Sequence, residues 1–145
     1  MAAWEGDAER LRQRGRTLID VLWEAMQRGD RVSIAAAGHS FTGKLTAARG
    51  DLALLATTDA EVALNLGTVD LVTYVRDGEG VSGDRSFGSF FAYLGMLEVE
   101  GVEVRLLGRD LDLAGLVDAV AADHVMLLGP TEGVVPITRI AAIVR

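Results

Sequence analysis

The sequence contains no cysteine, and this absence removes several kinds of structure and site at once. A chain without thiols has no disulfides, no thiolate metal ligands and no cysteine nucleophile. Histidine occurs only at His39 and His124, so a metal site would depend almost entirely on carboxylates. We expect both histidines to lie in turns or on the surface, and we predict no metal site.

Long apolar runs and basic leader segments are also lacking. No apolar stretch approaches the roughly 18 residues that a membrane-spanning helix requires. Residues 1–7 have neither the basic region nor the apolar region of a secretory signal. The sequence therefore predicts a cytoplasmic protein without membrane contact.

Positive charge is in short supply. The chain has 14 basic and 21 acidic residues, which give a formal net charge of −7. This charge opposes binding to phosphate backbones unless a local basic patch offsets it. Half of the 145 residues are hydrophobic, which is enough to bury a core and argues against disorder.

The first 30 residues have apolar side chains at helical spacing. Intervals of three and four residues predict an amphipathic helix of several turns, and Gly29 is expected to end it. The apolar stripe is long for a small domain, so this helix is also a candidate for contact with a partner. The stripe consists of Trp4, Ala8, Leu11, Gly15, Leu18, Leu22 and Ala25.

From residue 31 to residue 76 the apolar period changes to two. Short alternating segments with turn residues between them predict about five strands. Five short strands with a single apolar face are not stable as a flat sheet. We therefore expect them to curl into a small barrel that closes its edges.

The second half of the chain repeats this pattern. A shift of 72 residues aligns Leu22 with Leu94, Gly29 with Gly101, Gly43 with Gly115 and Asp51 with Asp123. Near the end of each half the shift drops to 69, which pairs Val75 with Val144. The chain is therefore predicted to contain one unit twice, a helix followed by five strands.

A helix followed by a strongly bent five-stranded barrel resembles the Sm and Sm-like family. The first motif of that family has a glycine in the second strand, then an Asp, then Met and Asn. Gly43 and Asp51 match it in the first half, and Gly115, Asp123 and Met126 match it in the second.

The resemblance implies a mainly β fold with helices, made of two tandem five-stranded barrels that are each preceded by an α-helix. The first helix and barrel would occupy residues 1–76. Residues 77–89, which are rich in glycine and charge, would form a linker. A short helix and the second barrel would occupy residues 90–145.

The residues that contact RNA in this family are replaced here. Leu55 and Leu127 stand in place of the base-contacting Asn. Leu66 replaces the Arg of the second motif beside Gly67, and Arg139 lacks the glycine that should follow it. RNA is therefore a disfavoured partner, because the polar groups that read the base are missing.

Asp51 and Asp123 correspond to each other and lie in the expected turn between the second and third strands. We expect each carboxylate to accept hydrogen bonds from nearby turn backbone rather than to act in catalysis. The sequence indicates no second group that would face the same pocket for general acid–base catalysis, no serine elbow and no glycine-rich phosphate loop. We therefore assign no catalytic residue and no cofactor.

Three functions stay open. The leading hypothesis is a non-enzymatic assembly or interaction protein that forms homo-oligomers, as a closed trimer or a dimer, through barrel edges or the N-terminal helix. The second is an RNA-binding regulator. The third is an enzyme or small-ligand binder that uses a cleft between the barrels. A nucleic-acid contact would need a basic rim formed by Arg49, Arg76, Arg105, Arg109 and Arg139.

Overall fold

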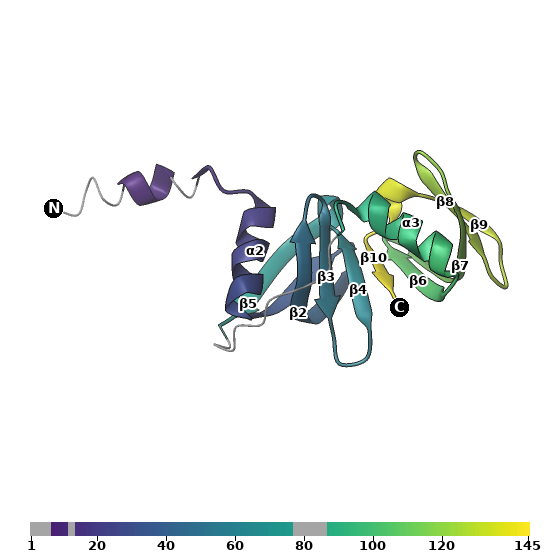
Figure 1. Ribbon diagram of the computed structural model, residues 1–145, viewed down its shortest axis with the longest axis horizontal. Helices are drawn as coiled ribbons and strands as arrows, with labels where there is room; N and C mark the ends of the chain where they lie inside the picture. The colour runs from purple at the N-terminus through teal and green to yellow at the C-terminus, as the bar shows by residue number, and fades with distance from the viewer. Residues whose placement is uncertain (1–6, 12–13, 77–86) are drawn as a thin grey trace.

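Backbone hydrogen bonds join ten strands into one antiparallel sheet in the computed structural model, which describes residues 7–11, 14–76 and 87–145 (Figure 1). The strands are β1 (Arg31–Ala36), β2 (His39–Arg49), β3 (Leu52–Ala56), β4 (Glu61–Asn65), β5 (Val69–Val75), β6 (Glu103–Gly108), β7 (Leu111–Val120), β8 (His124–Leu128), β9 (Gly133–Pro136) and β10 (Ala142–Val144). The helices are α2 (Leu18–Arg28) and α3 (Phe90–Glu100), with 3-10 turns η1 (Leu66–Thr68) and η2 (Ile137–Arg139).

The prediction of two tandem five-stranded barrels, each preceded by a helix, is wrong, although the mainly β character is right. The strand order is β5-β1-β2-β3-β4-β10-β6-β7-β8-β9, a single open sheet. β4 pairs with β10, so the hydrogen-bonding groups of these two strands are satisfied across the two halves of the chain. We expected closed barrels because the backbone groups of edge strands need hydrogen-bond partners. In the structure, β4 and β10 provide these partners for each other by joining the two halves.

The two halves have the same strand order on either side of the β4–β10 junction. Both second strands also have a register irregularity at the same place, between Leu45 and Ala47 in β2 and between Val117 and Ala119 in β7. These positions differ by 72 residues, in agreement with the sequence alignment.

The predicted shift of 69 near the end of each half is wrong. Leu66 N–H donates to the Asp51 carbonyl at 2.9 Å, and Ile137 N–H donates to the Asp123 carbonyl at the same distance. Leu66 and Ile137 are therefore equivalent, which is a shift of 71. One residue, not three, has been lost between β8 and β9 relative to β3 and β4.

The predicted N-terminal helix is interrupted. Residues 7–11 are helical, but the chain turns at Gly15 before α2 begins. Thr17 caps α2 in a reciprocal box with Asp20, and Gly29 ends it with a φ of 73°. α2 packs on β2 through Leu22, Ala25 and Met26.

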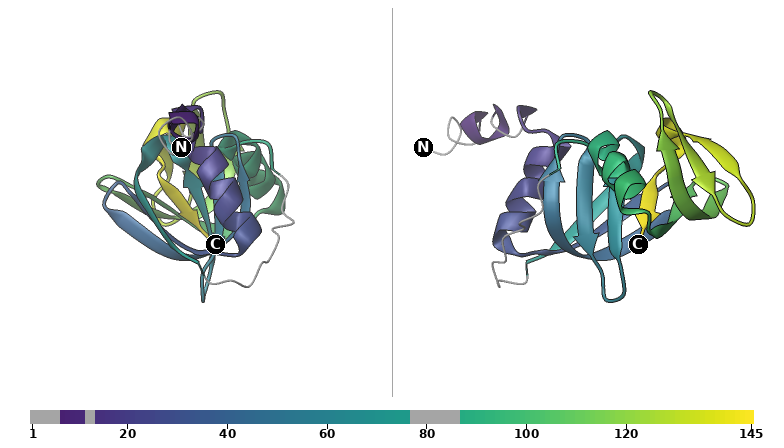
Figure 2. Two further views of the ribbon diagram at one scale, coloured as in Figure 1. Left: turned by 90° about the vertical axis from the view of Figure 1, so that its left-hand side faces the viewer. Right: turned by 45° about the vertical axis from the view of Figure 1, so that its right-hand side comes forward.

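α3 covers the centre of the molecule, where the two halves meet (Figure 2). Phe90, Tyr93, Leu94 and Leu97 are buried, and the helix packs against both β7 and β4. Its core therefore combines the inner face of the second half with the outer face of the first. The first-half members of this cluster are Ala47, Leu52, Leu54 and Ala63.

The end of the predicted linker contributes to this core. Residues 77–86 lie outside the described residues. Phe87 is partly buried against the α3 cluster, and its ring meets that of Tyr93 edge-on with 5.3 Å between the centroids. The pair adds to the apolar burial at the start of α3.

Asp51 has a different role from the one expected. Its carboxylate accepts a hydrogen bond from Phe90 N–H at 2.8 Å, so it satisfies a donor at the first turn of α3. Asp123 contacts its neighbour His124 instead, at 2.7 Å. The side chain of Asp51, in the β2–β3 turn of the first half, thus fixes the helix that belongs to the second half.

The glycines of the second strands are required by close backbone contact. A Cβ on Gly43 would lie 2.3 Å from the Ala56 carbonyl oxygen, and one on Gly115 would lie 2.3 Å from that of Leu128. We expect Gly43→Ala and Gly115→Ala each to lower the free energy of unfolding by about 1–3 kcal/mol, as overpacking does. Urea denaturation measures both changes. Gly95→Ala is the control, because nothing lies within 4 Å of its Cβ and it should stabilise α3 by about 0.5–1 kcal/mol.

Asp51→Ala should destabilise the protein by about 1 kcal/mol, because the Phe90 N–H loses its acceptor. Asp51→Asn keeps an acceptor oxygen and should restore most of the loss in the same denaturation experiment. Equal destabilisation by both substitutions would show that charge, rather than the hydrogen bond, holds α3.

Candidate functional site

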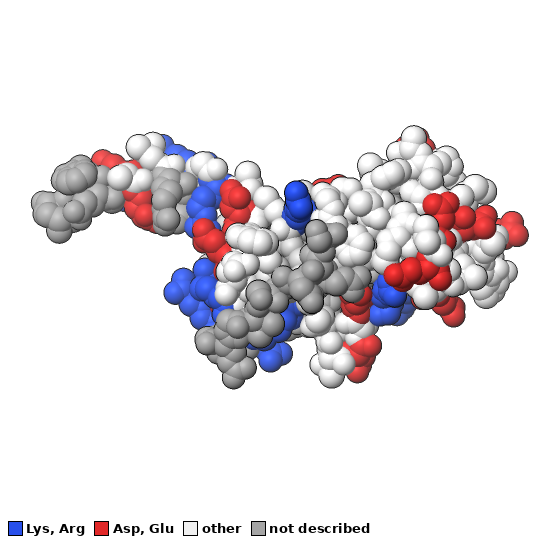
Figure 3. Space-filling model, in the orientation of Figure 1, with Lys and Arg blue, Asp and Glu red and all other residues white. Residues whose placement is uncertain are grey.

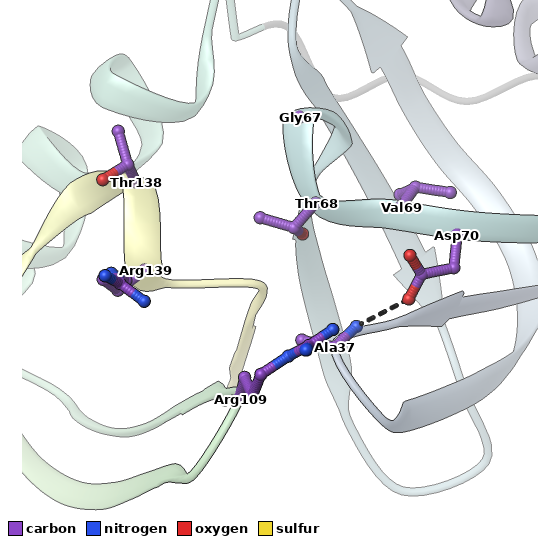
Figure 4. A pocket seen from close by; sticks show the side chains of 8 residues that line it. All are labelled: Ala37, Gly67, Thr68, Val69, Asp70, Arg109, Thr138 and Arg139. Carbon is purple, nitrogen blue, oxygen red and sulfur yellow. Dashed lines mark hydrogen bonds between the residues drawn. The ribbon is translucent and has the colours of Figure 1, made fainter.

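The five arginines predicted to form a basic rim do not gather in one place. Arg49 ends β2, and Arg76 follows β5. Arg105 lies in β6 and is bound to Asp112 through two hydrogen bonds of 2.7 and 2.5 Å. Arg109 and Arg139 line one cavity together (Figure 4).

This junction cavity has a volume of about 270 Å³ and lies where η1 contacts η2. Arg109 projects from the turn between β6 and β7, towards Ala37 and Asp70 of the first half (Figure 4). The Asp70 carboxylate accepts a hydrogen bond from Ala37 N–H at 3.2 Å. The lining residues are Ala37, Gly67, Thr68, Val69, Asp70, Arg109, Thr138 and Arg139.

Arg105 lies outside the cavity and is paired with Asp112 on the neighbouring strand β7. Hydrogen bonds from Arg105 lower the pKa of Asp112, and the charges of Arg105 and His39 act in the same direction. His39 itself reaches across to the second half, where its Nε2 lies 3.0 Å from the Gly108 carbonyl oxygen. The His39 contact therefore links the β6–β7 hairpin to the first half, whereas the Arg105–Asp112 pair lies within the hairpin.

Metal ligation has little support in the described part of the chain. No three His, Asp or Glu side chains lie together there in a way that could hold a metal ion. Within the same residues, no helix has the length and apolarity needed to span a membrane.

The β4–β10 junction shows how two edges of this sheet fit together. Leu64 lies opposite Ala142, and Ala63 lies opposite Ile143. Glu61 and Arg145 exchange two backbone hydrogen bonds of 3.0 Å at one end. The three central pairs include side chains from both hydrophobic clusters, so the junction is a packed interface as well as a hydrogen-bonded ladder.

The two outer strands, β5 and β9, are the repeat equivalents of β10 and β4. Their outer edges have no partner strand within the described residues. Leu71 of β5 is equivalent to Ala142 and is 58% exposed, whereas Ala142 is 0% exposed. Val134 of β9 is equivalent to Ala63 and is 62% exposed, whereas Ala63 is 0% exposed. Positions that the internal junction buries are therefore open at both ends of the sheet.

The outer face of β8 and β9 is open as well. Met126 lies opposite Val134, as Leu54 lies opposite Ala63 in the first half. α3 covers Leu54 and Ala63, while Met126 is substantially exposed. Sequence reasoning missed this surface, although the 72-residue alignment of Leu54 with Met126 was already an available signal.

No protein-family model matches this sequence, and no curated protein matches it significantly. The geometry of the chain itself is therefore the basis for inferring function.

Charge is distributed unevenly between the two ends (Figure 3). Residues 14–76 carry seven acidic and seven basic side chains, whereas residues 87–145 carry eight acidic and four basic ones. Basic groups lie around β5, where Arg28 sits over the Tyr74 ring and Arg31 lies opposite Val75. Acidic groups near β9 include Asp118 and Glu132, which line a shallow cavity there.

The Arg105–Asp112 pair predicts a pH dependence of stability. A folded-state pKa held below the unfolded value stabilises the fold above the unfolded pKa, and this contribution is lost as pH falls through the folded pKa. Arg105→Gln should therefore raise the pKa of Asp112 towards its ordinary value. A carbon NMR titration of the carboxyl group measures this pKa in both proteins. Identical midpoints would contradict the assignment of the shift to Arg105.

Proposed function

We propose that this chain is a non-enzymatic assembly protein, related to the Sm-like family, whose copies join head to tail. In this arrangement β9 of one copy pairs with β5 of the next. The observation that supports it is the β4–β10 junction, in which equivalent strands already pair within one chain.

The register of the proposed contact follows from the 71-residue equivalence. Leu71, Val72 and Thr73 correspond to Ala142, Ile143 and Val144 of the internal junction. Their partners in the neighbouring copy would be Val135, Val134 and Gly133. This contact would bury Leu71 and Val134, which are both largely exposed at the open edges of the single chain.

One feature of β9 makes the proposed contact weaker than the internal one. Asn65 donates its backbone N–H to the Ala141 carbonyl at 2.9 Å. Pro136 is equivalent to Asn65 and has no N–H, so the ladder between copies loses this hydrogen bond. The backbone groups of Glu132 and Val134 still supply the other hydrogen bonds.

α2 is suited to cover the exposed face of a neighbouring β9. Leu18 and Val21 of α2 correspond to Phe90 and Tyr93 of α3, which are buried over the internal junction. Leu18 is exposed and Val21 only partly buried in the single chain. In the assembly, Leu18 and Val21 of one copy would lie over Met126 and Val134 of the neighbouring copy. Within one chain, α3 lies over Leu54 and Ala63 in the same way.

Charge favours the same orientation. β9 carries acidic neighbours and β5 carries basic ones, so the edges that would meet are complementary. The contact joins two different surfaces. A contact of this type gives a ring if the rotation between copies closes, and a filament if it does not.

Val134→Lys should disrupt assembly, because it places a charge in the apolar part of the junction. We expect the dissociation constant to rise at least about tenfold, measured by sedimentation velocity over a range of concentrations. Val99→Lys is the matched control, since Val99 is 86% exposed on α3 and lies outside both edges. Leu71→Lys should act like Val134→Lys from the other side.

Mixing the two edge variants gives a sharper result. Val134→Lys retains an intact β5, and Leu71→Lys retains an intact β9. Each variant alone should be monomeric, while the mixture should stop at a one-to-one dimer. Wild-type protein that stays monomeric at high concentration, or variants that assemble as the wild type does, would contradict the proposal.

A further inference from the structure

We propose that the junction cavity between η1 and η2 binds a phosphate-class oxyanion, held by the guanidinium groups of Arg109 and Arg139. The ligand would be free phosphate or the phosphoryl group of a small molecule. The cavity is complete within one chain, so the proposal is independent of the head-to-tail assembly.

The cavity lining includes two pairs of equivalent positions whose residues differ between the halves. Arg109 corresponds to Ala37 by the 72-residue shift, and Arg139 corresponds to Thr68 by the 71-residue shift. All four line the cavity. Both charged replacements therefore occur in the second half and face one space, while the first half supplies smaller, uncharged side chains opposite them.

The polar groups of the lining differ in whether they already have bonding partners. Neither Arg109 nor Arg139 has an ion pair among the described residues, in contrast to Arg105. Each guanidinium presents five N–H donors in a geometry that suits a tetrahedral oxyanion. Thr68 already donates its hydroxyl hydrogen to the Asn65 carbonyl at 2.8 Å, so the side-chain donors that remain on the lining are the Thr138 hydroxyl and the two charged guanidinium groups.

The one acid in the cavity limits affinity without preventing binding. Asp70 accepts the Ala37 N–H, which directs one carboxylate oxygen into the β1–β2 turn. Two arginines against one carboxylate leave a net charge of +1 on the lining. Removing the Asp70 charge should therefore strengthen anion binding.

Size and surroundings favour a small ligand over a nucleic-acid strand. A volume of about 270 Å³ is below the roughly 300–1,000 Å³ of pockets that enclose drug-sized molecules, so one phosphoryl group fits better than a nucleotide chain. A strand would need a continuous basic track. Arg49, Arg76 and Arg105 lie on other elements and do not line this cavity.

The test is a proton–nitrogen NMR titration of the full chain with inorganic phosphate at constant ionic strength. We expect saturable shifts at the backbone amides of Gly67, Thr138 and Arg139. Arg109→Gln and Arg139→Gln should each weaken binding about tenfold. Arg105→Gln changes the net charge equally outside the cavity and should leave binding unchanged. Asp70→Asn keeps an acceptor for Ala37 N–H and should tighten binding.

Further ligands distinguish the source of the anion. Ribose 5-phosphate binding more tightly than inorganic phosphate, with ribose inert, would identify a phosphorylated small molecule. Equal binding of the two phosphates would identify the free anion. Linear shifts without saturation, or an equal loss of binding in Arg105→Gln, would overturn the proposal. So would binding that appears only with uridine oligomers lacking terminal phosphate, since this would indicate a nucleic-acid surface.

Discussion

The pairing of β4 with β10 is the constraint on which the rest of this molecule depends. It turns two five-stranded halves into one sheet, and it brings the outer face of β3 and β4 under α3. Because β10 belongs to the second half, neither half has an independent apolar core. Leu107, Ala141 and Ala142 pack in the first-half cluster, while Leu54 and Ala63 pack in the second. The junction cavity also exists only because this pairing places η1 beside η2.

The equivalent parts of the two halves have diverged where their surroundings differ. Ala63 is small and lies beneath α3, whereas its counterpart Val134 is larger and faces open space. Asp51 holds the start of α3, while Asp123 bonds to an adjacent histidine. Around the junction cavity, the neutral Ala37 and Thr68 oppose Arg109 and Arg139. The duplicated backbone thus carries two different sets of surface chemistry.

Local sequence features predicted the elements well and their connections poorly. Gly29 ends a helix as expected, the two-residue period identifies β1 to β5, and the 72-residue repeat is reproduced by the matching irregularities in β2 and β7. The partner of an edge strand leaves no such signature, because β4 has the same central run of three apolar residues whether it pairs with β5 or with β10. The grouping of Arg109 with Arg139, and their separation from Arg105, likewise depends on tertiary placement that residue spacing does not encode.

The position of β10 also bears on how the molecule folds. Among the strands of the described residues it comes last in the sequence, yet it lies in the middle of the sheet. The two backbone hydrogen bonds between Glu61 and Arg145 therefore join residues that are far apart in the sequence. The segment between them must be ordered before the two halves connect. Such non-local pairing slows folding, because loop-closure entropy is lost before the contacts form. Until β10 is in place, β4 and β6 are both unpaired on one side, and the partly folded chain has four open edges instead of two.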